Sequence, residues 1–110
     1  MRLFVHAPVV SQVHREQIQE RFETAFDRFG EFVQQAWVRL SDENGPRGGR
    51  DQSCLVRVAI QGGPDVVVTE RRDEPLEAVA HAIRRVRREL SDQINKRAKR
   101  RKAGGSRRDE

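Results

Sequence analysis

The sequence predicts a single α+β domain whose elements follow the order β-α-β-β-β-α. Two segments, at about residues 12–29 and 75–94, repeat apolar residues at helical spacing. Four shorter segments alternate apolar and polar residues, and glycine and proline punctuate the connections. We therefore expect a four-stranded sheet with both helices packed on one face and the other face open to water.

Residues 2–10 are expected to form the first strand. Because Pro8 cannot donate to a ladder, this strand should lie at an edge or end near Pro8. Ser11 is the candidate N-cap of the helix that follows, and Gly30 lies where a helix commonly ends in a left-handed residue. The apolar stripe of this helix consists of Val13, Ile18, Phe22, Ala25, Phe26 and Phe29. A right-handed crossover should make the first two strands parallel.

The next three strands are expected over residues 32–41, 54–60 and 65–71, as an antiparallel meander. A long glycine-rich loop over residues 42–52 and a tight turn at Gly62-Gly63-Pro64 connect them. The core-facing positions by alternation are Ala36, Val38, Leu40, Cys54, Val56, Val58, Ile60, Val66 and Val68. The remaining face of these strands should be exposed.

The last helix begins near Pro75, a residue suited to a first helical turn. Its stripe is Val79, Ile83, Val86, Leu90 and Ile94, and helix-forming residues continue to about Lys102. Such a helix would span about 42 Å, whereas a 100-residue globule has a radius of gyration near 13 Å. Its last two turns should therefore overhang the sheet. We expect one domain over residues 1–102 and a disordered tail over residues 103–110.

Positive charge is concentrated in one segment. Residues 1–78 carry ten arginines against thirteen acidic residues, whereas residues 79–103 carry ten basic residues against two acidic ones, a net charge of +8. This asymmetry indicates a polyanionic partner, either nucleic acid or an anionic membrane surface. Membrane binding requires an apolar face on the basic segment, and that face is needed to cover the sheet. Nucleic acid, and RNA in particular, is the favoured partner.

The basic helix supplies most of the candidate RNA-binding residues. At about 100° per residue, three arginines fall on its solvent side and Arg87 flanks the stripe. Like charges three or four residues apart destabilise a helix by about 0.2–0.5 kcal/mol per pair. The clustered arginines therefore do not stabilise the helix, which indicates a role in ligand binding. The candidates are Arg84, Arg85, Arg87, Arg88, Lys96, Arg97, Lys99, Arg100 and Arg101. The alternative is that this is a charged helix exposed to solvent, with a frayed basic end and no ligand.

A second candidate surface is the open face of the sheet. Alternation places Trp37 and Arg39 there, with Arg57 on the neighbouring strand. An aromatic residue beside arginine on a bare sheet is a common way to stack RNA bases. The alternative is a tryptophan covered by a loop or by a partner.

Other chemistry is not supported by the sequence. Cys54 alternates with core residues, which favours a buried inert thiol, and the histidines lack metal-ligand spacing. The carboxylates form no acid–base pair, so we expect no enzyme, no cofactor, no metal and no small-molecule substrate.

No apolar run reaches the roughly 18 residues of a membrane span. The first residues lack the apolar run expected of a secretory signal, and the single cysteine fits a reducing compartment. We therefore expect a cytoplasmic protein that does not enter a membrane.

The order of elements and several junctions resemble the ribosome hibernation-promoting factors, also called ribosome-associated translation inhibitors. The similar stretches are Val10-Ser11, Asp27-Arg28-Phe29-Gly30, Ala36-Trp37-Val38-Arg39-Leu40-Ser41, Leu55 to Gly63 and Ala78 to Ile94. The resemblance implies binding to small-subunit rRNA in the channel for messenger and transfer RNA, with translation silenced in stationary phase. It also implies that Arg84, Arg85, Arg87, Arg88, Lys96 and Arg97 face rRNA. Since the sequence ends at residue 110, it implies a short form without the second domain of the long forms.

Two other hypotheses remain open at this point. The chain could be a binding module for another structured RNA. It could instead be a protein-interaction module that uses the open sheet, with the basic helix incidental to its function.

Overall fold

The computed structural model describes residues 1–43 and 51–108, and it describes side chains as far as residue 98. Its elements are β1 (Arg2–His6), α1 (Gln12–Asp27), a 3-10 turn (Gly30–Phe32), β2 (Val33–Asp42), β3 (Gln52–Ile60), β4 (Val66–Arg72) and α2 (Pro75–Arg108). The predicted order β-α-β-β-β-α is confirmed. The predicted loop over residues 42–52 falls largely on residues 44–50, which lie outside the described residues.

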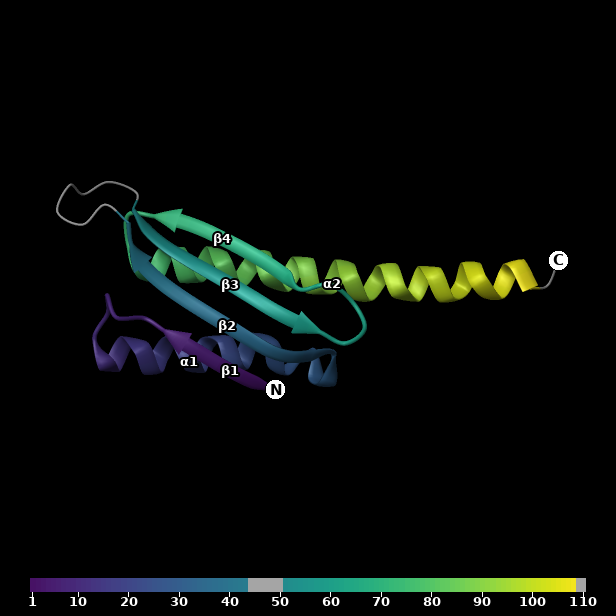
Figure 1. The fold of residues 1–110 in the computed structure, drawn as a ribbon, viewed down its shortest axis with the longest axis horizontal. Helices are drawn as coiled ribbons and strands as arrows, with labels where there is room; N and C mark the ends of the chain where they lie inside the picture. The colour runs from purple at the N-terminus through teal and green to yellow at the C-terminus, as the bar shows by residue number, and fades with distance from the viewer. Residues whose placement is uncertain (44–50, 109–110) are drawn as a thin grey trace.

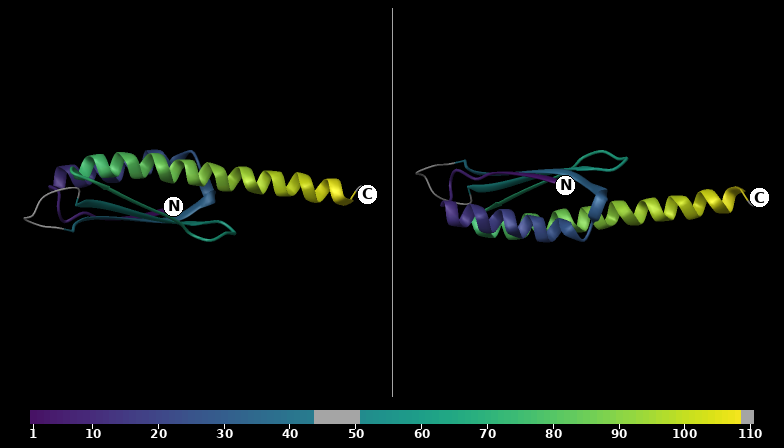
Figure 2. Two further views of the ribbon diagram at one scale, coloured as in Figure 1. Left: turned by 90° about the horizontal axis from the view of Figure 1, so that it is seen from above. Right: turned by 90° about the horizontal axis from the view of Figure 1, so that it is seen from below.

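The four strands form one sheet in the order β1-β2-β3-β4. The first two strands are parallel, and the β2–β3 and β3–β4 pairs are antiparallel, as the sequence predicted. Both helices cover the same face of this sheet, and no helix of the described residues lies on the opposite face (Figures 1 and 2). The molecule therefore has two outer surfaces of different character, one helical and one made of bare strands.

The core lies between the sheet and the two helices. Its largest fully buried side chains are Phe22, Phe26, Ile18, Leu40, Leu90, Val33, Val38, Val56, Val58, Val68, Val79 and Val86. Valine dominates the strands because its β-branched side chain packs well on a pleated surface. The alternation predicted for β2, β3 and β4 agrees with their burial.

Two stripe positions differ from the prediction. Val13 is 63% exposed, because it lies nine residues before Phe22 and so about 180° from it around α1. Ile94 is 37% exposed, and it lines a small hollow with Phe32 and Gln61 instead of entering the core. The stripe of α2 thus ends with Leu90 as its last fully buried residue.

The element boundaries follow local chemistry. β1 ends at His6 and the chain turns through Pro8, which cannot donate to the ladder. The Ser11 side chain accepts a hydrogen bond from the backbone N–H of His14 at 3.3 Å and caps α1 as predicted. After α1 ends, Gly30 adopts a φ of +54°, which favours glycine, and the chain turns into β2.

The helix α2 is longer than expected. It continues to Arg108, six residues beyond the predicted end near Lys102, so residues 103–108 are helical where we expected a disordered tail. The alanine, lysine and arginine residues of 96–102 are strong helix formers, whereas Gly104 and Gly105 disfavour the helix that contains them. α2 runs past the turn between β3 and β4 and gives the molecule extents of 64 × 24 × 16 Å (Figure 1). The division into a 1–102 domain and a tail stays a prediction.

Candidate nucleic-acid interface

The outer side of α2 carries the predicted arginines. Arg84, Arg85 and Arg88 are exposed and Arg87 is half-buried, as their positions around the helix predicted. Arg84 lies 3.4 Å from the Nδ1 of His81. Among the described residues no carboxylate pairs with Arg84 or Arg88. These two guanidinium groups keep their hydrogen-bond donors available for an anion.

Arg85 differs from its neighbours because it contacts the sheet. Its Nη1 donates to the backbone carbonyl oxygen of Thr69 at 3.1 Å and lies 3.7 Å from Oε2 of Glu70. Both partners belong to β4, at the edge of the sheet. Arg85 therefore holds the edge strand against α2, in addition to any contact it makes with a ligand.

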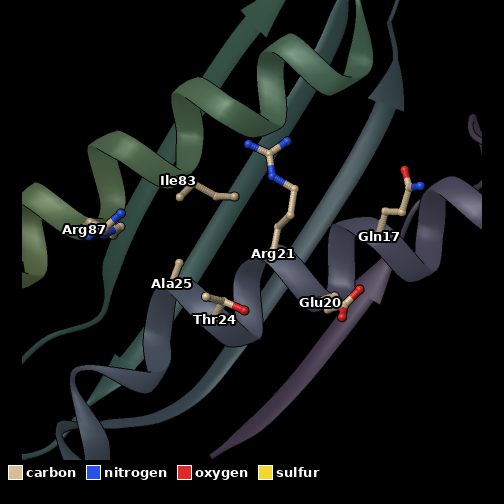
Figure 3. Close-up of a pocket in the computed structure, with 7 residues that line it drawn as sticks. All are labelled: Gln17, Glu20, Arg21, Thr24, Ala25, Ile83 and Arg87. Carbon is tan, nitrogen blue, oxygen red and sulfur yellow. The ribbon is translucent and has the colours of Figure 1, made fainter.

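Arg87 faces a groove between the two helices, opposite Arg21 of α1. Figure 3 shows Arg21 extending from α1 towards α2, while Ile83 and Arg87 project from α2 into the same space. The groove has a volume of about 610 Å³ and is lined by Gln17, Glu20, Arg21, Thr24, Ala25, Ile83 and Arg87. Neither arginine has a carboxylate partner within 4 Å among the described residues. Two cations from separate helices thus line one groove, which can receive a phosphate.

Sequence reasoning did not identify Arg21. Its only signal was its place one residue before the buried Phe22, which puts it at the flank of the α1 stripe. Flanking positions can reach a neighbouring helix, but the neighbour and its charge are set by the tertiary arrangement.

Arg97 was predicted to overhang the sheet, but its side chain packs against the sheet's β3–β4 turn. It is half-buried, with its guanidinium carbon 5.0 Å from the ring centroid of Phe32. An added Cβ on Gly63 would lie 2.7 Å from Arg97 Nη2, so the side chain packs directly on the β3–β4 turn. Arg97 follows Val79 by eighteen residues, which is about five helical turns, and therefore faces the sheet.

The free projection of α2 begins beyond this contact. Lys96 is exposed, as expected. Lys99, Arg100 and Arg101 belong to the helical backbone of α2, and their side chains lie outside the described part of the chain.

The open face of the sheet brings Trp37 and Arg57 together, as the sequence suggested. A row across the sheet is formed by Phe4, Trp37, Arg57 and Val67, which are cross-strand partners. The guanidinium carbon of Arg57 lies 5.5 Å from the Trp37 ring centroid, and Arg57 Nε lies 2.7 Å from Oδ2 of Asp65. Trp37 is 36% exposed, so no described residue covers it fully.

Phe4 is a further residue of this surface that the sequence reasoning missed. Its ring stacks with Trp37 at 6.4 Å between centroids and an interplanar angle of 16°. The sequence contained a signal for this position. Leu3 and Val5 pack against the core, so the alternation of side chains along a strand places Phe4 on the opposite, open face. Arg39, in the adjoining row, is exposed and has no ion pair among the described residues.

Other candidate chemistry is limited. Cys54 is buried. Its burial, and to a smaller extent the nearby Glu70 carboxylate, raises the pKa of its thiol to about 12, so Cys54 is a poor nucleophile. No group of three His, Cys, Asp or Glu side chains suited to a metal ion occurs in the described ranges. In the part of the chain that the structure describes, no helix is long and apolar enough to cross a membrane.

Comparison with known proteins finds structural neighbours only. No family model matches the sequence, and no curated protein matches it. Among solved structures, a ribosomal subunit interface protein from Coxiella burnetii is similar with a TM-score of 0.64 and 13% identity, over 86% of this chain and 99% of that one. The N-terminal domain of Protein Y from Thermus thermophilus is similar with a TM-score of 0.60 and 20% identity, over 81% of this chain and 91% of that one. The chain shares their fold.

Proposed function

We propose that this protein is a ribosome-associated translation inhibitor of the hibernation-factor type. It binds rRNA of the small subunit in the channel for messenger and transfer RNA and silences or protects idle ribosomes. The observation that carries this proposal is the convergence of arginines without carboxylate partners on the helical surface, from both α1 and α2. The fold likeness to a protein described as a ribosomal subunit interface protein supports the choice of the ribosome as partner.

The helical surface would act as the rRNA-binding surface. Arg84 and Arg88 present exposed guanidinium groups without a carboxylate partner among the described residues, and Arg21 and Arg87 line the groove beside them. Guanidinium groups bind phosphates in a bidentate manner, and such charge-assisted hydrogen bonds are about twice as strong as neutral ones. Lys96 and, on the projecting end of α2, Lys99, Arg100 and Arg101 add to the same electrostatic footprint.

The mechanism is occlusion without catalysis. An elongated body of 64 × 24 × 16 Å with a basic helical side has a shape suited to lying along an RNA-walled channel. While it is bound, messenger and transfer RNA are excluded from the same space. Release would follow when competing RNA or ions displace its arginines from the phosphates.

A sucrose-gradient profile of the tagged protein from resting cells tests the proposal. We expect the protein to sediment with the small subunit and with 70S ribosomes at low salt, and to move to the top of the gradient at high salt. In cell-free translation the full chain should inhibit synthesis, and added initiator tRNA should relieve the inhibition. A protein that stays at the top of the gradient at low salt would contradict the proposal.

Another structured RNA is the second candidate, and the unpaired arginines on the helical surface favour it equally. The same gradient separates the two functions. Binding to another RNA would place the protein in a ribonuclease-sensitive fraction outside the ribosomal peaks. A protein-interaction module would give a complex that resists ribonuclease.

A further inference from the structure

The open face of the sheet has the features of a second binding surface, on the side of the molecule opposite the helices (Figure 2). Four large apolar side chains are exposed there: Phe4 at 49%, Trp37 at 36%, Leu55 at 38% and Val67 at 57%. They lie on four adjacent strands, with Arg57 between Trp37 and Val67 in one cross-strand row and Leu55 in the next row. Nothing in the proposed helix-side contact with RNA uses this patch.

A hollow lies at the β1–β2 end of the patch. It has a volume of about 380 Å³ and is lined by Phe4, Val5, His6, Trp37, Val38 and Arg39. Two of its lining side chains are the stacked rings of Phe4 and Trp37. In the next cross-strand row His6 pairs with Arg39, and both residues line the hollow as well. The hollow therefore brings two aromatic rings and a guanidinium group together.

The charges around the hollow favour an anionic ligand. Arg57 is held beside Trp37 by its 2.7 Å ion pair with Asp65, and Arg71 is paired with Glu43 at 2.9 Å. Arg2 and Arg39 have no ion pair among the described residues. The face therefore carries excess positive charge next to exposed rings. An apolar segment of a protein would leave these guanidinium groups without a partner, whereas a nucleotide supplies both a flat base and a phosphate.

We propose that this hollow binds one unpaired base of single-stranded RNA against Phe4 and Trp37, with Arg39 holding the adjoining phosphate. This inference deepens the proposed function and rests on it only in that RNA is the partner. The two surfaces lie on opposite sides of the sheet, so one molecule can contact two RNA segments at once. The base would be a single-stranded one, because bases within a duplex are stacked and cannot enter a hollow on a sheet.

The chain contains its own reporter for this site. Trp37 is the only tryptophan and there is no tyrosine, so intrinsic fluorescence excited at long wavelength comes from this surface alone. The full-length protein is titrated with an oligoadenylate octamer and, separately, with inorganic polyphosphate of similar charge. We expect the oligonucleotide to quench Trp37 in a saturable manner. Polyphosphate carries no base and should leave the emission unchanged.

Two exposed side chains of the same row provide a matched pair of variants. Phe4→Ala removes a ring from the hollow and should weaken oligonucleotide binding about fivefold or more, the range found for loss of one aromatic–base contact. Val67→Ala removes an exposed apolar side chain at the far end of the row and should leave the affinity unchanged. Thermal melts establish that both variants are folded. Equal affinities for the two variants, or equal quenching by polyphosphate, would overturn the inference.

The inference and the proposed function fail separately in this design. Arg84→Glu combined with Arg88→Glu changes the opposite side of the molecule and should not change the quenching by the octamer. Quenching that persists while ribosome sedimentation fails would sustain the base-binding site and reject the ribosomal function. Absence of quenching by the octamer would overturn the inference, even where intact small subunits quench Trp37.

Discussion

At the scale of single residues, arginines that look alike in the sequence have different contacts. Arg84 and Arg88 have no carboxylate partner among the described residues, whereas Arg85 binds β4 and Arg97 packs on Phe32. The first two are available to a ligand. The other two also hold α2 to the sheet, so a loss of binding after their substitution would not by itself identify a ligand contact.

Arg97→Ala tests the structural role of this residue. The change removes a cation–π contact worth about 0.5–1 kcal/mol at a partly exposed site. We expect the melting temperature to fall by roughly 2–8 °C. Lys96→Ala is the control, because Lys96 is exposed and forms no ion pair in the described part of the chain. Equal melting temperatures for the two variants would show that Arg97 does not anchor α2.

Cys54 should be inert in the folded protein. Burial, and then Glu70, raise the pKa of its thiol to about 12, so the reactive thiolate is scarce at pH 8. A chromogenic thiol reagent should modify it only at the rate of unfolding, and immediately in denaturant. The stabilisation tied to this pKa is complete below about 9, its ordinary value, and is lost as the pH rises towards 12. Rapid modification of the native protein would contradict the buried position.

At the scale of elements, α2 combines two tasks along its length. Its first half packs on the sheet through Val79, Val86 and Leu90, which are fully buried. Its second half extends beyond the Arg97 contact with the β3–β4 turn. The first half of α2 thus positions arginines on the folded domain, and its second half positions further arginines beyond the sheet.

The double variant Arg84→Glu and Arg88→Glu tests the outer side of α2. Both side chains are exposed and lack a carboxylate partner in the described part of the chain, so the fold should be retained. Binding to purified small subunits should weaken at least about tenfold, because two charge-assisted contacts with rRNA become repulsive. Arg85 is left unchanged, since a glutamate there would face Glu70.

The conservative variant Arg84→Lys with Arg88→Lys is the control for that experiment. It keeps both positive charges and should retain most of the salt-dependent affinity. Filter binding to purified small subunits measures both. Full affinity of the glutamate variant would exclude the outer side of α2 as the binding surface.

Deletion of residues 99–110 tests the projecting end of α2. The deletion removes six basic and two acidic residues, but it spares Arg97 and Ala98. We expect weaker binding with an unchanged melting temperature. A deletion that begins at Lys96 should also lower the melting temperature, because it removes the Arg97 contact with Phe32. Identical melting temperatures for the two deletions would contradict this difference.

At the scale of the whole molecule, the basic helical surface predicts strong salt dependence. For single-stranded contacts log K falls with log salt at about 0.7 per phosphate neutralised. Engagement of roughly five phosphates gives a slope of about −3.5, so raising salt from 50 to 200 mM should weaken binding about a hundredfold. Equilibrium binding to small subunits across this range measures the slope. A nearly flat curve would favour a protein partner held by apolar contacts of the open sheet.

The candidate site could be predicted in part from the sequence. Helical and alternating periodicity placed Arg84, Arg88, Trp37 and Arg57 on the correct faces, because these periods are properties of the local backbone. Phe4 and Arg21 were missed. Phe4 belongs to the site because its ring stacks with Trp37 of another strand. Arg21 belongs to it because it lines the same groove as Arg87 of another helix.

By itself the sequence determined the order of elements, the parallel first strand pair, the composition of the core and the clustering of positive charge on the last helix. Alternation, helical spacing, capping and chain connectivity are enough for these features. Only the tertiary structure decided which side chains meet across elements, such as Arg85 with Thr69 and Arg97 with Phe32. The physical reason is that such contacts depend on strand register and helix placement, which join residues far apart in the chain and leave no local pattern.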